Sequence, residues 1–215
     1  MGFALTEYVK IKDNYCICYF GHQTAYLVQL RILRPFIEQA LPKLRLYICC
    51  NDEYLYLFED EPRIVAHSQI DKKQFAFIRE LVANKDHVIE NLLKESDIAI
   101  PALPQTNKDG VCLILPEGIP PVKSVSVQML EKYARLRGLE PIVVGSDVNA
   151  SMQSIVYRPK GEERLRLAKQ AKIAIGVECD LLYLTGFYGG RTVLMSNSCG
   201  LDFYRKLFPD GNICS

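Results

Sequence analysis

The 215-residue sequence lacks tryptophan, has only three histidines and contains none of three common ligand or nucleophile fingerprints. The patterns G-x-G-x-x-G, G-x-x-x-x-G-K-[ST] and G-x-S-x-G are absent. Their absence leaves no grounds for a dinucleotide fingerprint, a P-loop or a hydrolase nucleophile elbow. An excess of one charge sign is also missing, because 26 Lys and Arg oppose 25 Asp and Glu. The net charge of +1 gives no general attraction to nucleic acid or to an anionic membrane.

Membrane and secretion signals are absent as well. No apolar run approaches the roughly 20 residues that span a bilayer. The first ten residues, MGFALTEYVK, lack the basic start and apolar core of a secretory signal. We therefore expect a cytoplasmic protein without a transmembrane segment.

The eight cysteines do not form C-x-x-C pairs, the spacing typical of zinc sites. The nearest approaches are Cys16-x-Cys18 and Cys49-Cys50, and six of the eight lie in or beside apolar segments predicted as strands. Buried thiols behave as small hydrophobic groups, and reducing compartments keep them free. We expect free cysteines and no metal site.

Short apolar runs alternate with amphipathic segments in the first half of the chain. The run 15–20 is aromatic-rich and is followed by Gly21, which is typical of a buried strand, and apolar residues then recur at helical spacing from Leu27 to Leu41. Strand, helix and strand in this order predict a right-handed βαβ unit. The same reasoning predicts strands at 15–20, 44–50, 63–66 and 98–101 and helices at 27–41, 53–58 and 73–94.

The segment 104–110 is polar and turn-forming, so we predict a linker there. The alternation then restarts, with strands predicted at 111–115, 141–144, 154–157, 173–176 and 192–195 and helices at 126–137, 162–171 and 181–188. Such alternation gives parallel sheets covered on both faces. The prediction is therefore an α/β chain of two consecutive Rossmann-like domains, 1–103 and 111–215.

Ligands of parallel α/β sheets bind at the carboxyl ends of the strands, so polar residues at those positions are the candidates for chemistry. His22 follows the first strand, where an imidazole is either a general base or a helix cap. His67 and His87 belong to no motif. Lys123 follows the loop after the first strand of the second half and can pair with a phosphate, unless it is simply solvated.

Two further strand ends lie in the second half. Gly145-Ser146 lets a ligand approach the backbone closely, or forms an ordinary turn. Glu178-Cys179-Asp180 runs into a helix, whose N-terminal N–H groups favour anions. Asp180 serves equally as the cap of that helix, and Glu178 can accept hydrogen bonds from a sugar or ribose hydroxyl.

These strand ends and the order of elements resemble the GT-B glycosyltransferases, most closely the heptosyltransferase-like family 9. In that family the first strand leads into a Gly-Asp turn and a helix with a P-x-L-R-x-L pattern. Here Gly21-His22 and the segment 28–33 fall in the same register, so His22 stands where the family carries its catalytic Asp.

The second half resembles the family at the loop Pro116-x-Gly118, at Lys123, at Gly145 and at the segment 175–184. The family pattern I-G-x-D-S-G-x-x-H-L reads here as IGVECDLLYL, followed by a strand with Thr-Val at 192–193. Four residues replace the family's Asp, Ser, Gly and His, in that order: Glu178, Cys179, Asp180 and Tyr183. The chain is also shorter than usual for this architecture, and from its sequence we expect none of the extended C-terminal helix that the family commonly carries.

The resemblance implies transfer of a sugar from a nucleotide-diphosphate donor to a glycan, lipid or protein acceptor, with no metal and no further cofactor. His22 would be the general base on the acceptor side. Asp180 would bring negative charge near the donor diphosphate and would need a cation such as Lys123. The implied donor site consists of Lys123, Gly145, Ser146, Glu178, Cys179 and Asp180.

Two alternatives remain open at this point. The altered motif favours a non-catalytic GT-B-like protein that binds a nucleotide or a partner. A nucleotide-sugar epimerase shares the same two-domain plan.

Overall fold

A computed structural model describes residues 14–21, 24–59, 61, 63–81, 99, 102–103, 109–116, 126–145, 155–195 and 201–214. The chain divides into two compact units, Met1–Pro101 and Ala102–Ser215. The N–H of Leu103 donates to the carbonyl of Leu207 at 2.7 Å. Leu103 therefore belongs to the second unit, although the sequence assigned it to the first.

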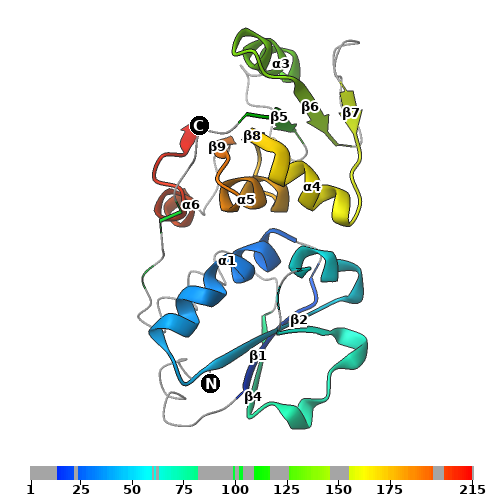
Figure 1. Ribbon diagram of the computed structural model, residues 1–215, viewed down its shortest axis with the longest axis vertical. Coiled ribbons are helices and arrows are strands. Elements are labelled where there is room, and N and C mark those ends of the chain that lie inside the picture. The colour runs from blue at the N-terminus through cyan, green and yellow to red at the C-terminus, as the bar shows by residue number, and fades with distance from the viewer. Residues whose placement is uncertain are drawn as a thin grey trace. The chain divides into compact units, whose positions relative to one another are not determined.

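The first unit contains a four-stranded, fully parallel sheet in the order β3-β2-β1-β4 (Figure 1). Both faces of its central strand β1 are buried, with residues 15–19 each at most 2% exposed, which explains why this run is apolar without alternation. The elements of this unit are β1 Asn14–Tyr19, α1 Thr24–Ala40, β2 Arg45–Cys50, β3 Ile64–Ala66 and β4 Phe77–Leu81, with short 3₁₀ turns η2 Asp52–Phe58, η3 His67–Gln69 and η4 Lys72–Gln74.

Strand β4 corrects the predicted helix at 73–94. The Asp71 carboxylate accepts the N–H of Lys73 at 3.0 Å and holds η4, and the chain then extends from Phe77 to pair with β1. The N–H of Ala76 donates to the Asn14 carbonyl at 3.0 Å and starts that pairing. The long-range ladder overrides the local helical pattern. Residues 82–94 lie outside the described residues, as does all of the predicted strand 98–101 except Ala99.

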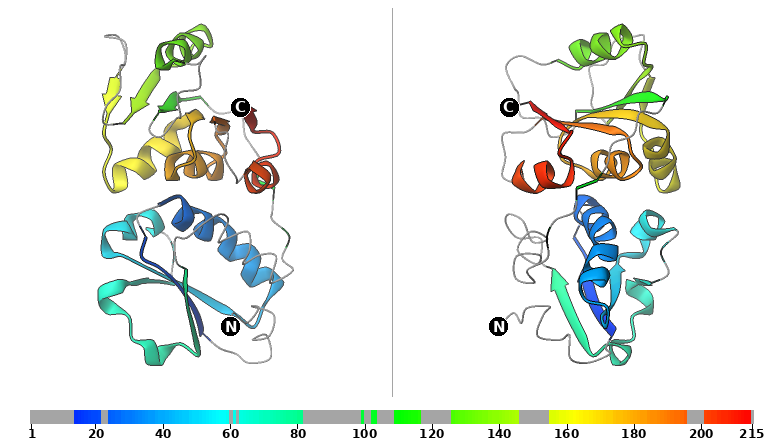
Figure 2. Two further views of the ribbon diagram at one scale, coloured as in Figure 1. Left: turned by 180° about the vertical axis from the view of Figure 1, so that it is seen from behind. Right: turned by 60° about the vertical axis from the view of Figure 1, so that its left-hand side comes forward.

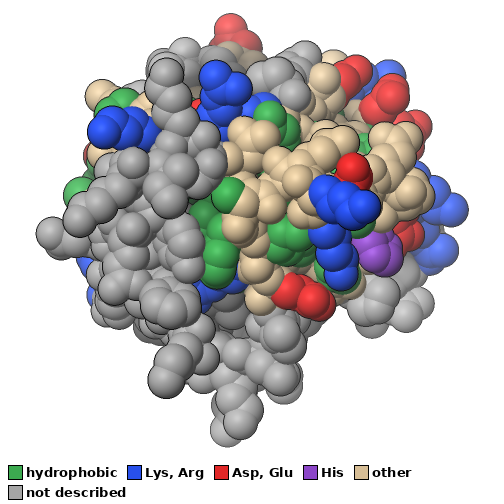
Figure 3. All heavy atoms as spheres, turned by 90° about the horizontal axis from the view of Figure 1, so that it is seen from below, with side chains coloured by type: hydrophobic (Ala, Val, Ile, Leu, Met, Phe, Trp, Pro, Cys, Tyr) green, Lys and Arg blue, Asp and Glu red, His purple; other side chains and the backbone are tan. Residues whose placement is uncertain are grey.

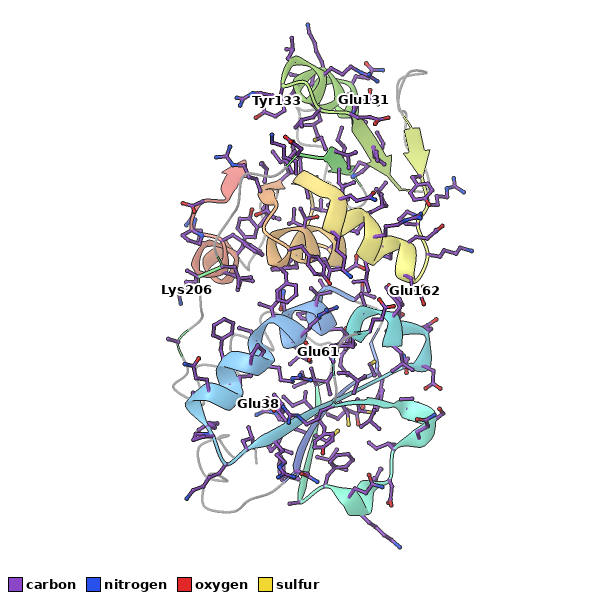
Figure 4. The ribbon with its side chains drawn as sticks, viewed as in Figure 1. Glu38, Glu61, Glu131, Tyr133, Glu162 and Lys206 are labelled. Atoms are coloured by element: carbon purple, nitrogen blue, oxygen red, sulfur yellow. The ribbon has the colours of Figure 1, made fainter. Side chains whose placement is uncertain are left out.

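Helix α1 packs on one face of this sheet, where the rings of Tyr19 and Tyr26 lie 5.7 Å apart. Polar contacts also tie α1 to its neighbours, because Glu38 pairs with Arg63 and accepts the Leu46 N–H at 3.0 Å. A second ion pair joins Arg34 to Glu61 (Figure 4).

The opposite face of the sheet carries a cluster of Cys16, Cys18, Cys49 and Phe75, each less than a tenth exposed. These thiols and the buried Cys50 and Cys112 are free, as predicted. Figure 3 shows basic and acidic side chains interspersed over the described part of one face of the molecule, in keeping with the near-zero net charge.

The second unit contains a six-stranded parallel sheet in the order β10-β9-β8-β5-β6-β7. Helix α3 covers one face, and α4, α5 and α6 cover the other (Figures 1 and 2). The prediction of two parallel α/β units is confirmed. The strands are β5 Val111–Leu115, β6 Pro141–Val144, β7 Ile155–Tyr157, β8 Ala171–Gly176, β9 Arg191–Met195 and β10 Asn212–Cys214, and the helices are α3 Val127–Leu136, α4 Glu162–Gln170, α5 Asp180–Phe187 and α6 Leu201–Leu207.

Local signals set the ends of α3. The Ser126 hydroxyl accepts the N–H of Met129 at 3.3 Å, and Gly138 follows the helix with a φ of +68°. Helix α6 and strand β10 were not predicted. None of the described helices is long and apolar enough to cross a membrane.

Candidate functional site

Each sheet reverses its strand order beside its first strand. In the second unit, β6 and β7 lie on one side of β5, and β8, β9 and β10 lie on the other. In the first unit the reversal falls between β1 and β4. Ligands of open α/β sheets bind outside the carboxyl ends of the strands at such a switch point. The segment after β8 and the segment after β1 are therefore the positions where chemistry is expected.

Gly176 is the last residue of β8, and its backbone lies close to Leu115 of β5, with which it pairs. Its φ is +154°, and a Cβ placed on it would lie 2.1 Å from the Leu115 carbonyl oxygen. The next residue, Val177, donates its N–H to the same oxygen at 3.1 Å. Only glycine allows this approach, and it holds the start of the Glu178 segment at the switch point.

Asp180 begins α5 and is only 1% exposed. Its carboxylate makes a two-point contact with Arg164 of α4, with Arg164 Nε donating to Oδ2 at 2.7 Å and Nη2 donating to Oδ1. The N–H of Leu181 also donates to Oδ1, at 2.9 Å. Arg164 is thus a cation that compensates this carboxylate. Sequence reasoning missed it, because nothing in the pattern links two residues sixteen positions apart on different helices.

Glu178 is exposed, and its Oε1 accepts a hydrogen bond from the Tyr183 hydroxyl at 2.7 Å. Tyr183 itself is fully buried in α5. Cys179 directly follows Glu178 in the sequence. Burial raises the pKa of its thiol to about 12, and the negative charge of Asp180 adds to this effect. Cys179 therefore stays a neutral thiol near pH 7, which makes it a poor nucleophile.

The remaining predicted site residues are placed only in part. Gly145 follows β6 and is buried, and its N–H donates to the Tyr157 carbonyl at 3.3 Å. Gly145 and Glu178 both lie at the carboxyl ends of their strands, and β5 separates those two strands in the sheet. His22, Lys123 and Ser146 lie outside the described residues.

His67 is exposed and lies beside the end of β1. Its ring is 4.4 Å from the ring of Phe20, the residue that follows this strand. The sequence placed His67 in no motif. His67 follows β3, and the pairing of β3 with β2, the neighbour of β1, brings it near the end of β1. His67 is therefore an imidazole close to the switch point of the first unit. Among the described residues, no group of three or more His, Cys, Asp or Glu side chains is arranged to hold a metal ion.

No protein-family model matches the sequence, and no curated protein matches it either. Solved structures do match. The fold is similar to that of the iron-containing dodecameric glycosyltransferase TibC of enterotoxigenic E. coli H10407, with a TM-score of 0.59 and 14% identity over 86% of this chain and 60% of TibC. The chain has a heptosyltransferase-like fold. The E. coli heptosyltransferase WaaC, solved with ADP-2-deoxy-2-fluoro heptose, matches with a TM-score of 0.58 and 10% identity, over 94% of this chain and 92% of WaaC.

A glycosyltransferase family 9 protein from Veillonella parvula DSM 2008 also has this fold, with a TM-score of 0.54 and 9% identity, over 86% of this chain and 80% of that one. The resemblance in the order of elements is therefore matched by the fold. The chain spans about three-fifths of the length of TibC. At identities of 9–14%, the similarity to these structures establishes the fold of the chain.

Proposed function

We propose that this protein is a glycosyltransferase that binds a nucleotide-diphosphate sugar on its second unit and transfers the sugar to an acceptor held by its first. The observation that carries the proposal is the Glu178-Cys179-Asp180 segment at the β5–β8 switch point, in a fold shared with two heptosyltransferases. One TibC structure contains ADP-D-beta-D-heptose, and one WaaC structure contains an ADP-heptose analogue.

The proposed reaction needs a base, a way to hold the donor and a way to stabilise the leaving group. An acceptor hydroxyl attacks the anomeric carbon and loses its proton to His22, the bond from that carbon to the diphosphate oxygen breaks, and the electron pair leaves with the nucleoside diphosphate. Lys123 and backbone N–H groups at the strand ends stabilise the leaving charge. Glu178 binds a ribose or sugar hydroxyl, and no metal takes part.

The Arg164–Asp180 pair makes this arrangement electrostatically possible. An unpaired carboxylate at the start of α5 would repel a diphosphate, but both oxygens of Asp180 face Arg164. The local charge of the pair is therefore close to zero, and in this proposal Lys123 supplies the positive charge for the donor diphosphate.

The first test is thermal unfolding of the protein with ADP-, UDP-, GDP- and CMP-sugars and with the free nucleotides. A ligand at about a hundred times its dissociation constant stabilises the folded state by roughly 2.7 kcal/mol. We expect one nucleotide class to raise the melting temperature and Lys123→Ala to abolish that rise. Lys160→Ala, which changes an exposed lysine between β7 and α4, is the matched control and should keep it.

With the donor class known, His22→Ala should lower turnover about a hundredfold or more, the usual contribution of a general base. The donor-induced rise in melting temperature should persist, because His22 acts on the acceptor. His67→Ala should retain turnover. If His67→Ala lowers turnover while His22→Ala retains full turnover, the general base is His67 instead.

A second candidate function has one observation in its favour. Asp180 and Arg164 neutralise each other at the start of α5, where a free helix N-terminus would otherwise attract a phosphate. This arrangement suits a non-catalytic protein that binds a nucleotide weakly or binds a partner. Donor binding without sugar transfer or donor hydrolysis, with intact His22, would favour this second function.

A further inference from the structure

Helix α3 has two apolar faces, only one of which packs on the sheet. Val127, Leu130 and Ala134 point toward the core of the second unit. On the opposite side, Met129, Tyr133 and Leu136 are 57%, 40% and 77% exposed. Their spacing of four and three residues aligns them along one outer stripe. We call these three residues the outer stripe.

The outer stripe is bordered by cations. At 100° per residue, Lys132 and Arg137 fall on its two sides and Arg135 lies farther round the helix, and all three are exposed. The Arg137 guanidinium lies 5.1 Å from the centre of the Tyr133 ring, so it packs along the stripe. The single acidic residue of the helix, Glu131, is only 2% exposed (Figure 4). The next acidic residue in the sequence, Glu140, is exposed but lies beyond the end of the helix.

Apolar side chains flanked by Lys and Arg are the pattern of a helix that lies in a lipid interface. Tyrosine suits the headgroup level, because its ring is apolar and its hydroxyl is polar. The net charge of the chain is only +1, so an attraction to anionic lipid has to be local, as it is on α3. Within the second unit α3 lies on the outside of its face of the sheet (Figures 1 and 2), and the three side chains of the outer stripe are exposed there.

A second copy of this chain fits the outer stripe less well. Two stripes paired about a two-fold axis would set Lys132 and Arg137 of one copy against the same cations of the other. Like charges in contact oppose association. The charge pattern therefore favours an anionic occupant over a self-contact.

From these contacts we infer that α3 is a peripheral membrane-binding surface, with the outer stripe inserted among the headgroups of anionic lipids and Lys132, Arg135 and Arg137 contacting their phosphates. This surface does not depend on the proposed sugar transfer, and it takes an anionic lipid bilayer as its ligand. Contact is reversible, since only three side chains enter the interface.

Co-sedimentation of the full chain with vesicles tests this inference. The chain should bind vesicles that contain phosphatidylglycerol and should not bind pure phosphatidylcholine vesicles. Each cation near an anionic surface strengthens binding about fivefold, so Lys132→Gln/Arg137→Gln should weaken it about 25-fold. Leu136→Ser should weaken it roughly tenfold, the scale for withdrawing a leucine from an apolar phase.

The matched control is Arg166→Gln/Lys206→Gln, which removes two exposed cations from α4 and α6 on the other face of the sheet. This variant should bind as the unmodified chain does, and melting temperatures should show that every variant is folded. The inference is overturned if no vesicle is bound, or if both double variants bind equally. It is also overturned if Leu136→Ser instead dissolves a dimer that forms without lipid.

Discussion

Replacing Gly176 with alanine should lower the free energy of unfolding of the second unit by about 3 kcal/mol or more, a loss in the range of severe backbone clashes. The new Cβ would lie 2.1 Å from the Leu115 carbonyl oxygen and 2.6 Å from the Leu115 Cβ. Neither atom can swing away, because Leu115 is held in the β5–β8 ladder. The strands would have to separate at the switch point.

Urea unfolding of Gly176→Ala measures this loss, and Gly138→Ala is the matched control. Gly138 also has a positive φ, +68°, but a Cβ there meets nothing within 4 Å. Its substitution should cost only the left-handed strain of about 1–2 kcal/mol. Equal losses in the two variants would show that strain alone, and not the contact with β5, limits residue 176.

Replacing Arg164 with alanine should lower the free energy of unfolding by about 3 kcal/mol, because removing one partner of a buried ion pair leaves an uncompensated charge. Asp180 is 1% exposed and has few ways to regain water. The Arg164 side chain is 24% exposed, which places the expected loss at the lower end of the range for buried pairs.

The control for this variant is Arg166→Ala, which removes an exposed arginine from the same helix and should change stability by less than about 0.5 kcal/mol. The double variant Arg164→Ala/Asp180→Asn should be more stable than Arg164→Ala alone, since it removes the stranded charge. If the double variant is instead the less stable of the two, the loss arises from packing of the arginine stem.

Much of the fold could be predicted because burial leaves a direct trace in the sequence. The runs 15–20 and 111–115 are apolar without alternation, as strands paired on both edges and covered on both faces must be. Ser126 and Gly138 likewise mark the ends of α3 by local hydrogen bonding and backbone conformation.

Other features depend on contacts that no local pattern records. Strand β4 forms because its edge pairs with β1, more than 60 residues earlier, although its own residues fit a helix. Arg164 reaches Asp180 because α4 packs on α5. His67 lies beside Phe20 because β3 pairs with β2. The sequence placed the Glu178 segment directly after a strand, as the structure does, but the cation that pairs with Asp180 comes from another helix.

The buried cysteines make local unfolding of each unit measurable separately. Cys16 and Cys49 of the first unit and Cys112 of the second are wholly enclosed, and burial raises the pKa of the Cys112 thiol to about 12. An alkylating reagent can reach such sulfurs only when the surrounding strands part. The rate at which each cysteine is labelled, read by mass spectrometry of its peptide, therefore follows the breathing of one sheet at a time, and a ligand that closes one unit would slow labelling there and leave the other unchanged.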